Sequence, residues 1–240
     1  MGNARTSRRP YVLLSCAASI DGYIDDASER RLRLSNEADF DRVDEVRAGC
    51  DAILIGAGTI RADNPRLLVR SQARRDARAR RGRPTNPLKA TLTGRGDLDP
   101  AALFFTTGEA PKVVYATTSA LEKTRDRVGA VAEIVDVGEP ADLGRMLDDL
   151  ASRGVGRLMV EGGGAVHTQF LTAGLADELQ LVIAPFFVGD PRAPRFVHGG
   201  AFPWDPASPA RLAEVTRIDD VVLLRYAMSD SYPGGPAPVG

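Results

Sequence analysis

The stretch Arg157-Leu158-Met159-Val160-Glu161-Gly162-Gly163-Gly164-Ala165-Val166-His167-Thr168-Gln169-Phe170-Leu171 decides the fold that we expect of this chain. A short apolar run ends in an acidic residue and three glycines, after which apolar residues recur at helical spacing. This order predicts a buried strand, a tight turn and an amphipathic helix. Glycines let a ligand's phosphate groups approach the backbone, and the start of a helix offers free N–H groups. The stretch therefore predicts either a nucleotide or phosphate site or a plain turn that uses glycine for packing.

Strand and helix patterns alternate on both sides of this stretch. Strands are expected over 10–18, 51–56, 88–93, 112–116, 130–137, 178–185 and 211–226, with a short turn plus strand over 100–105. Helices are expected after the capping residues Ser35 and Asn36 and over 142–153, and another short element is expected to start at Gly58 and to end near Asp63. The alternation predicts an α/β fold with a mostly parallel central sheet and flanking helices. The close spacing of the last strands predicts an antiparallel C-terminal edge.

Composition indicates an ordinary globular chain. It has 240 residues, 43% of them hydrophobic, and a formal net charge of -1, so no overall charge favours nucleic acid or an anionic membrane. We expect a single domain over 10–228, with flexible tails over 1–9 and 229–240, because these ends are polar or rich in proline and glycine. The N-terminus lacks the apolar core of a signal peptide, and no apolar run reaches the roughly 18 residues of a membrane span.

The cysteines and histidines are few. Cys16 and Cys50 form no C-x-x-C pair, so we expect reduced thiols in a cytoplasmic protein. His167 and His198 are too few for a typical histidine-based zinc site, and no metal is expected. His167 lies within the helix after the glycines, where we interpret it as a bystander on the surface or lining the site.

Residues 70–87 break the alternating pattern. They hold seven arginines and two prolines and almost no large apolar residue. A solvated loop is favoured over an anion-binding segment, because runs of charge are usually solvated. A nucleic-acid binder is disfavoured by the balanced overall charge and by the lack of interleaved aromatic residues.

Several motifs together resemble one family, although none would suffice alone. They are Ala17-Ala18-Ser19-Ile20-Asp21-Gly22, the stretches 34–47 and 51–67, Glu161-Gly162-Gly163-Gly164, and the stretch 177–185. In this combination, and in order over residues 10–226, the chain resembles the riboflavin-biosynthesis pyrimidine reductases. That family includes the reductase half of the bifunctional deaminase/reductase and free-standing archaeal and fungal enzymes.

The resemblance implies a dihydrofolate-reductase-like fold, a homodimer and NADPH as cofactor. The implied substrate is a ribosylaminopyrimidine 5′-phosphate, whose opened ribose accepts hydride at C1′ to give a ribitylamino product. The chain lacks the H-x-E and P-C-x-x-C pattern of zinc deaminases, so we expect it to reduce and not to deaminate.

The resemblance also implies roles for single residues. The positions that match cofactor contacts are Ala17, Thr59, Asp63, Gly162, Gly163, Gly164, Ala165 and Val166. Thr93, in Thr93-Gly94-Arg95, is our candidate neighbour of the cofactor's 2′-phosphate. The positions that match substrate contacts are Arg47, Leu67, Arg70 and Glu161. Asp63 and Glu161 are the expected catalytic residues, with Asp63 relaying a proton, while Arg47 and Arg70 suit the substrate's phosphate.

Two departures leave the substrate open. Bacterial bifunctional members usually have lysine where this chain has Ser15, and tryptophan where it has Arg33. The substrate is therefore a riboflavin precursor with or without the 2-amino group, or a relative used in a specialised pathway. The alternative functions are a dihydrofolate or pterin reductase of the same fold, and a non-catalytic module that binds NADPH. Without the resemblance, Asp63 is equally a turn residue before Asn64-Pro65, and the arginines are ordinary surface residues.

Overall fold

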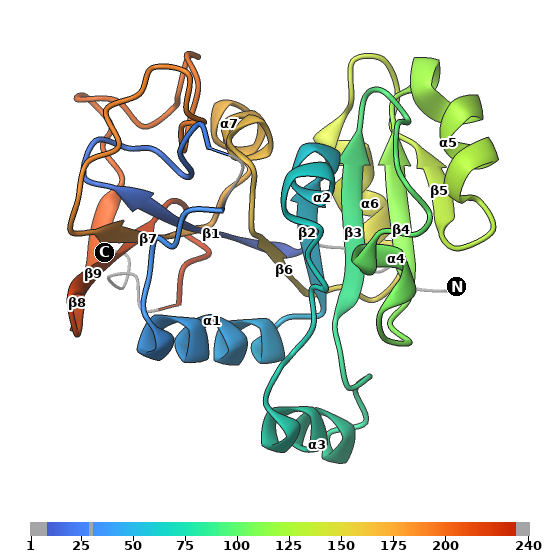
Figure 1. Ribbon diagram of the computed structural model, residues 1–240, viewed down its shortest axis with the longest axis horizontal. Helices are drawn as coiled ribbons and strands as arrows, with labels where there is room; N and C mark the ends of the chain where they lie inside the picture. Colours follow the sequence, from blue (N-terminus) through green and yellow to red (C-terminus); the bar gives the residue numbers. More distant parts are fainter. Residues whose placement is uncertain (1–8, 29–30, 234–240) are drawn as a thin grey trace, which may run out of the picture.

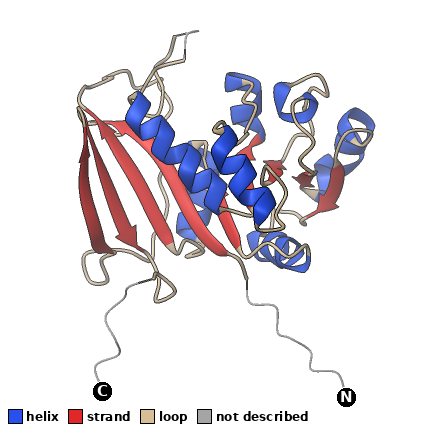
Figure 2. Ribbon diagram, turned by 90° about the horizontal axis from the view of Figure 1, so that it is seen from below, coloured by secondary structure: helices blue, strands red, loops and turns tan. Residues whose placement is uncertain are grey.

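The computed structural model describes residues 9–28 and 31–233, and within them it contains one sheet of nine strands. From edge to edge these are β5 (Glu133–Asp136), β4 (Lys112–Ala116), β3 (Leu88–Thr93), β2 (Ala52–Gly56), β6 (Arg157–Val160), β1 (Tyr11–Ser19), β7 (Glu178–Ala184), β9 (Val221–Ala227) and β8 (Arg211–Ile218). Neighbours from β5 to β7 pair in parallel, whereas β9 pairs antiparallel with both β7 and β8. The predicted α/β class, mostly parallel sheet and antiparallel C-terminal edge are confirmed. Figure 2 shows the long strands of this edge gathered on one side of the molecule.

Helices cover both faces of the sheet (Figure 1). They are α1 (Glu37–Gly49), α2 (Ala57–Asp63), α3 (Gln72–Arg80), α4 (Leu103–Thr106), α5 (Leu121–Val128), α6 (Leu143–Ser152) and α7 (Gly164–Thr172), with a 3-10 turn, η1 (Thr118–Ala120). Successive strand residues point to opposite faces, so Leu14 and Leu54 pack in the core under α6 and α7. Leu13 and Ile53 pack instead in the core under α2, α4 and α5, against which α1 also lies. Figure 1 shows α1 and α7 on opposite sides of β1.

The helix starts follow from the sequence. The Asn36 side chain accepts a hydrogen bond from the Asp39 amide at 3.0 Å, which caps α1 as predicted. Helix α6 buries Leu143, Met146, Leu147 and Leu150, the four residues expected to face inward. The glycine stretch forms β6, a turn and α7 in the predicted order.

Two expectations about local structure are wrong. The arginine-rich segment contains helix α3 and is not a solvated loop, because contacts distant in sequence hold it. Ser71 caps the helix, and the guanidinium of the buried Arg78 donates to the carbonyls of Ala48 and Cys50 at 2.8 and 2.7 Å. Residues 103–106 form the short helix α4 and not a strand. Both phenylalanines of α4 are buried, and the Asn64 side chain accepts from the first amide of the helix.

The inner ends of the predicted tails meet at one buried carboxylate. Arg9 donates to Asp177 at 2.7 and 2.8 Å, and the Ser229 hydroxyl donates to it at 2.6 Å. The rest of the N-terminal tail, residues 1–8, and residues 234–240 lie outside the described residues. Within residues 9–28 and 31–233, no helix combines the length and the apolar character needed to cross a bilayer.

Candidate functional site

A cavity of about 490 Å³ opens where strands β1 and β6 part. Their last pair is Leu14 with Val160, and the residues after that pair on both strands line the cavity. From β1 these are Ser15, Cys16 and Ala17, and after β6 they are Glu161, Gly162 and Gly163. The cavity thus lies at the carboxyl ends of parallel strands, where open α/β sheets bind ligands.

One side of the cavity, which we call the glycine wall, consists of Thr59, Gly162, Gly163 and His167. Gly162 has a φ of 123°, a conformation that glycine adopts without strain. A Cβ on Gly162 would lie 3.6 Å from His167 Nε2, and one on Gly163 would lie 3.3 Å from Thr59 Oγ1. The missing side chains therefore leave space between a hydroxyl and an imidazole, and the Thr59 hydroxyl bonds to no other described residue.

His167 is fully buried in the first turn of α7. Neither ring nitrogen has a hydrogen-bond partner within the described residues, and the ring packs against Phe196 with 5.5 Å between centroids. Burial lowers the pKa of His167 to about 4, so the imidazole is neutral near pH 7. The bystander interpretation placed it on the surface or lining the site, and the structure places it in the cavity lining.

Another part of the lining, which we call the arginine wall, consists of Arg33, Phe40, Arg42 and Arg70. The guanidinium carbons of Arg33 and Arg70 lie 5.0 and 5.9 Å from the centre of the Phe40 ring. Arg33 also donates to Glu37 at 2.7 Å, on the exposed surface. Arg42 is balanced by the buried carboxylate of Asp39 at 2.7 Å.

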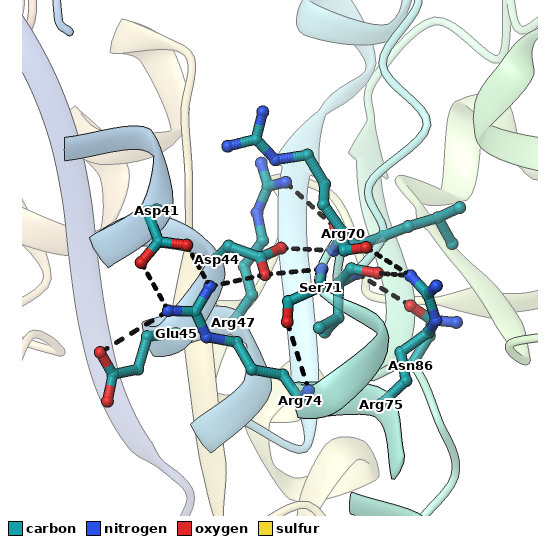
Figure 3. A network of polar contacts seen from close by, with 11 residues as sticks. Asp41, Asp44, Glu45, Arg47, Arg70, Ser71, Arg74, Arg75 and Asn86 are labelled. Atoms are coloured by element: carbon teal, nitrogen blue, oxygen red, sulfur yellow. Dashed lines mark hydrogen bonds and ion pairs between the residues drawn. The ribbon is translucent and has the colours of Figure 1, made fainter. Parts of the chain in front are cut away.

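The position of Arg70 depends on a carboxylate network on α1 (Figure 3). The buried Asp44 accepts from the backbone amides of Arg70 and Ser71 and from the Arg74 side chain. Burial works against the charge of Asp44, but these donors outweigh it and lower its pKa. Asp44 therefore holds the backbone of Arg70, while the Arg70 guanidinium points away from the network in Figure 3. Within the described chain, that guanidinium pairs with no carboxylate.

An ion pair between Arg47 and Glu161 also lines the cavity. Arg47 donates from Nε to Glu161 Oε1 at 2.6 Å and from Nη2 to Oε2 at 2.5 Å. The two side chains are 19% and 13% exposed, so the pair is largely shielded from water. Burial alone would lower the pKa of Arg47, but the charge of Glu161 outweighs it and raises that pKa. This bidentate pair fixes the carboxylate directly before the glycine turn.

Asp63 lies at the C-terminal end of α2, with its side chain 17% exposed. Burial raises the pKa of this carboxyl, and the guanidinium of Arg31, 3.6 Å away, opposes the rise. Asp63 therefore keeps its proton to a higher pH than an aspartate in water.

The cavity brings together many of the residues singled out from the sequence. Those in its lining are Ala17, Arg47, Thr59, Asp63, Arg70, Glu161, Gly162 and Gly163. Leu67 lies instead in the core at 4% exposure, and the buried Thr93 hydroxyl accepts from the amides of Arg95 and Gly96. Gly164 packs against the Arg195 carbonyl, Ala165 is exposed, and Val166 is in the core. These five residues are outside the cavity lining.

Sequence reasoning missed three kinds of lining residue. Phe40 was treated only as part of a helix pattern, and Arg33 only as a departure from relatives. Asp39 gives no local signal, because its partners are ordinary neighbours in the chain: Ser35 just before α1 and Arg42 on it. Within the described residues, no group of three or more His, Cys, Asp or Glu side chains could hold a metal ion.

Comparisons with known proteins agree on one family. The sequence model of the RibD C-terminal domain matches residues 10–224. The chain is 37% identical, over 88% of its length and 95% of the relative's, to a 2,5-diamino-6-ribosylamino-4(3H)-pyrimidinone 5′-phosphate reductase from Archaeoglobus fulgidus. A protein of the same name from Methanothermobacter thermautotrophicus is 36% identical over 80% of this chain and 85% of its own. A solved pyrimidine reductase-like protein from Corynebacterium diphtheriae, 22% identical, has the same fold, with a TM-score of 0.76 over 91% of both chains.

Proposed function

The chain belongs to the RibD C-terminal domain family, and we propose that it is an NADPH-dependent oxidoreductase that reduces a ribosylaminopyrimidine 5′-phosphate to the ribitylamino compound. The observation that carries the proposal is one cavity lined by two unlike walls and by the Arg47–Glu161 pair. A glycine turn with neutral polar groups suits part of a dinucleotide, and unbalanced guanidinium charge suits a phosphate. The names of relatives matched over most of their length support the same reaction.

The glycine wall fits a nicotinamide cofactor. A Cβ at Gly162 or Gly163 would fill the space between Thr59 and His167, so both glycines leave room for a ligand. At the start of α7, the amides of Gly164 and Ala165 have no acceptor among the described residues and can donate to a diphosphate. Ala17 offers a small side chain to the same cavity. Thr59, Gly162 and Gly163 are thus the proposed cofactor-binding residues.

The arginine wall is the proposed site of the substrate's phosphate. Arg70 has no carboxylate partner, and Arg33 pairs only with the exposed Glu37, so both can donate to a dianion. Guanidinium groups bind phosphate through two parallel hydrogen bonds. Arg47 instead orients Glu161, and the carboxylate of Glu161 accepts from amino groups of the pyrimidine.

In the proposed mechanism Asp63 supplies the proton. A nicotinamide cofactor held by Thr59, Gly162 and Gly163 would supply a hydride to C1′ of the opened ribose. The C1′–N double bond of the opened form becomes a single bond, and the nitrogen takes the proton. Asp63, whose burial favours the protonated form, delivers that proton directly or through one water. Glu161 and Arg70 hold the substrate during this step.

We further propose that residues 10–228 act as one reductase unit and form a homodimer in the cytoplasm. The antiparallel edge supports the dimer, because Leu212, Val215 and Val222 on β8 and β9 are 49%, 59% and 38% exposed. The free thiols of Cys16 and Cys50 suit a reducing compartment. Light scattering on the purified protein should give twice the chain mass.

An assay tests the proposed reaction. The purified protein is mixed with NADPH and the ribosylaminopyrimidine 5′-phosphate, and NADPH absorbance and product mass are recorded. We expect NADPH oxidation and a product heavier than the substrate by two hydrogens. Turnover of dihydrofolate instead would support a pterin reductase. NADPH binding without turnover of any pyrimidine would support a non-catalytic module.

A further inference from the structure

Arg42 is the member of the arginine wall whose guanidinium is fixed by two side chains. Its Nε donates to Asp39 Oδ1 at 2.7 Å, and its Nη1 donates to Gln180 Oε1 at 2.6 Å. The side chains of Arg42 and Asp39 are only 19% and 4% exposed. Because the two contacts involve different nitrogens of one planar group, the guanidinium cannot turn without breaking one of them. Arg42 is therefore held in one orientation.

The remaining guanidinium nitrogen of Arg42, Nη2, is left for a ligand. It donates to no described residue. Among the described residues, the side-chain nitrogen and oxygen atoms that are both buried and without a partner belong to Thr91 and His167, so Nη2 is accessible to solvent. Because Arg42 lines the cavity, its two free N–H donors are available to a molecule that binds there.

Ser15 adds a second free polar group next to this arginine. Ser15 on β1 and Gln180 on β7 are partners in the parallel register, so their side chains point to the same face of the sheet. Arg42 contacts that face through its bond to Gln180. The Ser15 hydroxyl lines the cavity, bonds to no described residue and is not among the buried unpaired atoms. Arg42 and Ser15 thus form a polar corner of the cavity.

The charge balance of Arg42 indicates which chemical group this corner can bind. Asp39 neutralises Arg42, whereas Arg70 on the same wall has no carboxylate partner. A dianionic phosphate is therefore attracted to Arg70 more than to the Arg42–Asp39 pair. Free N–H donors and a hydroxyl suit an uncharged oxygen acceptor, and a ring carbonyl of a pyrimidinone is such an acceptor.

We propose that Arg42 is a substrate-binding residue that donates from Nη2 to a carbonyl oxygen of the pyrimidine ring, and that Gln180 is the positioning residue that orients it. The inference rests on the proposed function and adds a residue that recognises ring oxygens, while Glu161 accepts from ring amino groups. Gln180 is 4% exposed and lies outside the cavity lining, so it acts through Arg42. Its amide nitrogen donates to Glu178 at 2.7 Å, which directs the amide oxygen toward Arg42.

The first variant tests the contact made by Arg42. Arg42→Lys keeps a cation beside Asp39 but removes the planar fork, and steady-state kinetics are measured with NADPH and the ribosylaminopyrimidine 5′-phosphate. We expect KM for the pyrimidine to rise about tenfold, the size of one hydrogen bond to a charged donor, with kcat and the NADPH dissociation constant within about twofold. The matched control is Arg153→Lys, because Arg153 is 21% exposed, donates from Nε to Asp149 at 2.7 Å and lies outside the cavity lining.

A second ligand separates the pyrimidine ring from the phosphate. The ribitylaminopyrimidine without its 5′-phosphate is used as a competitive inhibitor of the full chain. Its inhibition constant should rise by the same factor as KM in Arg42→Lys and should stay unchanged in Arg70→Ala. An unchanged KM in Arg42→Lys would overturn the proposal. So would a raised KM with an unchanged inhibition constant, because Arg42 would then bind the phosphate.

The second variant, Gln180→Met, tests the positioning role. It removes the amide that orients Arg42, while Glu178 keeps three other donors, Tyr11, Arg157 and Arg225. We expect KM to rise about threefold at an unchanged melting temperature, and the double variant with Arg42→Lys to show no further rise, because an ammonium has no fork to orient.

An unchanged KM in Gln180→Met, or equal losses in KM, kcat and NADPH affinity together with a lower melting temperature, would show that Gln180 is only structural. A further rise of KM in the double variant would mean that Gln180 does not act through Arg42. A wild-type protein that does not oxidise NADPH with this substrate would contradict the proposed function itself, whereas wild-type turnover with an unaffected Arg42→Lys contradicts only the role of Arg42.

Discussion

The two walls of the cavity differ in the kind of polar group that they present. The arginine wall carries full charges, and most of them are balanced by carboxylates such as Asp39. The glycine wall carries no charge, and its polar atoms on Thr59 and His167 have no partner among the described residues. The comparison teaches that unpaired polar atoms, as much as charges, indicate where a ligand is expected to bind.

The walls also differ in what holds them in place. The glycine wall is part of the β6–α7 connection, so its backbone is fixed by the sheet. In the arginine wall, Arg70 depends on Asp44, whose carboxylate holds the backbone at Arg70 and Ser71 to α1. A substitution at Asp44 can therefore loosen Arg70 from outside the cavity lining, while the glycine wall requires a change within the turn.

The largest effect is expected at the Arg47–Glu161 pair. Glu161→Gln leaves the Arg47 guanidinium without its countercharge and weakens the acceptor for the substrate. Breaking a largely buried pair costs about 3–5 kcal/mol of folding stability. Because the substrate also loses its charged acceptor, we expect kcat/KM to fall by roughly a thousandfold. Steady-state kinetics measure it, and the control is Glu133→Gln, which breaks an exposed pair with Arg153. If Glu161→Gln kept the wild-type kcat/KM, the Arg47–Glu161 pair would have no role in the reaction.

Asp63→Asn tests the proton donor between the walls. We expect kcat to fall by about a hundredfold, the usual contribution of general acid catalysis, while the NADPH dissociation constant stays within about twofold. Single-turnover rates and a binding titration separate the two effects. If kcat is unchanged, Asp63 has no part in the chemistry.

The raised pKa of Asp63 also predicts a pH dependence of stability. The folded protein binds this proton more tightly than the unfolded chain, so Asp63 reduces stability as the pH rises from the ordinary aspartate pKa through the raised one. Asp63→Asn should therefore be more stable than the wild type near neutral pH, and the difference should vanish in acid. Urea unfolding at several pH values measures it, and a destabilised variant at neutral pH would show that the charge of Asp63 is needed by the fold.

Arg70→Ala removes the unpaired charge of the arginine wall alone. A hydrogen bond to a charged group contributes about 1.5–3 kcal/mol, so KM for the phosphorylated substrate should rise by roughly 10- to 100-fold with little change in NADPH affinity. Arg66→Ala is the matched control, because Arg66 is exposed and does not line the cavity. Equal KM values for the two variants would place the phosphate elsewhere.

The smallest effect is expected at Asp44, which does not line the cavity but holds the backbone of Arg70. Asp44→Asn should raise KM by only about two- to fivefold, because the loop at Arg70 loses charged acceptors but keeps its covalent position. Since the folded pKa of Asp44 is lowered, its stabilising contribution is present above the ordinary aspartate pKa and is lost as the pH falls through the lowered one. The stability gap to Asp44→Asn should close in acid, measured by urea unfolding. A gap independent of pH would mean that packing, and not charge, holds the loop.

The sequence predicts those elements whose stabilising contacts lie between residues close together in the chain. Asn36, Gly162 and the apolar residues of α6 act through neighbours in the chain, and the elements that they define were predicted. Arg78 acts through the carbonyls of Ala48 and Cys50, about 30 residues away, so helix α3 was missed. Buried partners distant in sequence leave no local pattern.

The same distinction applies to the site. Arg47, Asp63 and Glu161 were identified through motifs and meet in the cavity lining, although their roles stay proposals. Leu67 and Val166, identified by the resemblance, and Thr93, identified from Thr93-Gly94-Arg95, are used by the fold for packing or for a turn. The contact between Phe40 and two arginines and the isolation of His167 exist only in three dimensions.

The most direct test of the two-wall account is a crossed titration. The dissociation constants of NADPH and of the ribosylaminopyrimidine phosphate are measured for Arg70→Ala and for Thr59→Val. The account predicts that Arg70→Ala weakens only the pyrimidine phosphate and that Thr59→Val weakens only NADPH. Equal weakening of both ligands by both variants would contradict it, because the two walls would then serve one undivided site.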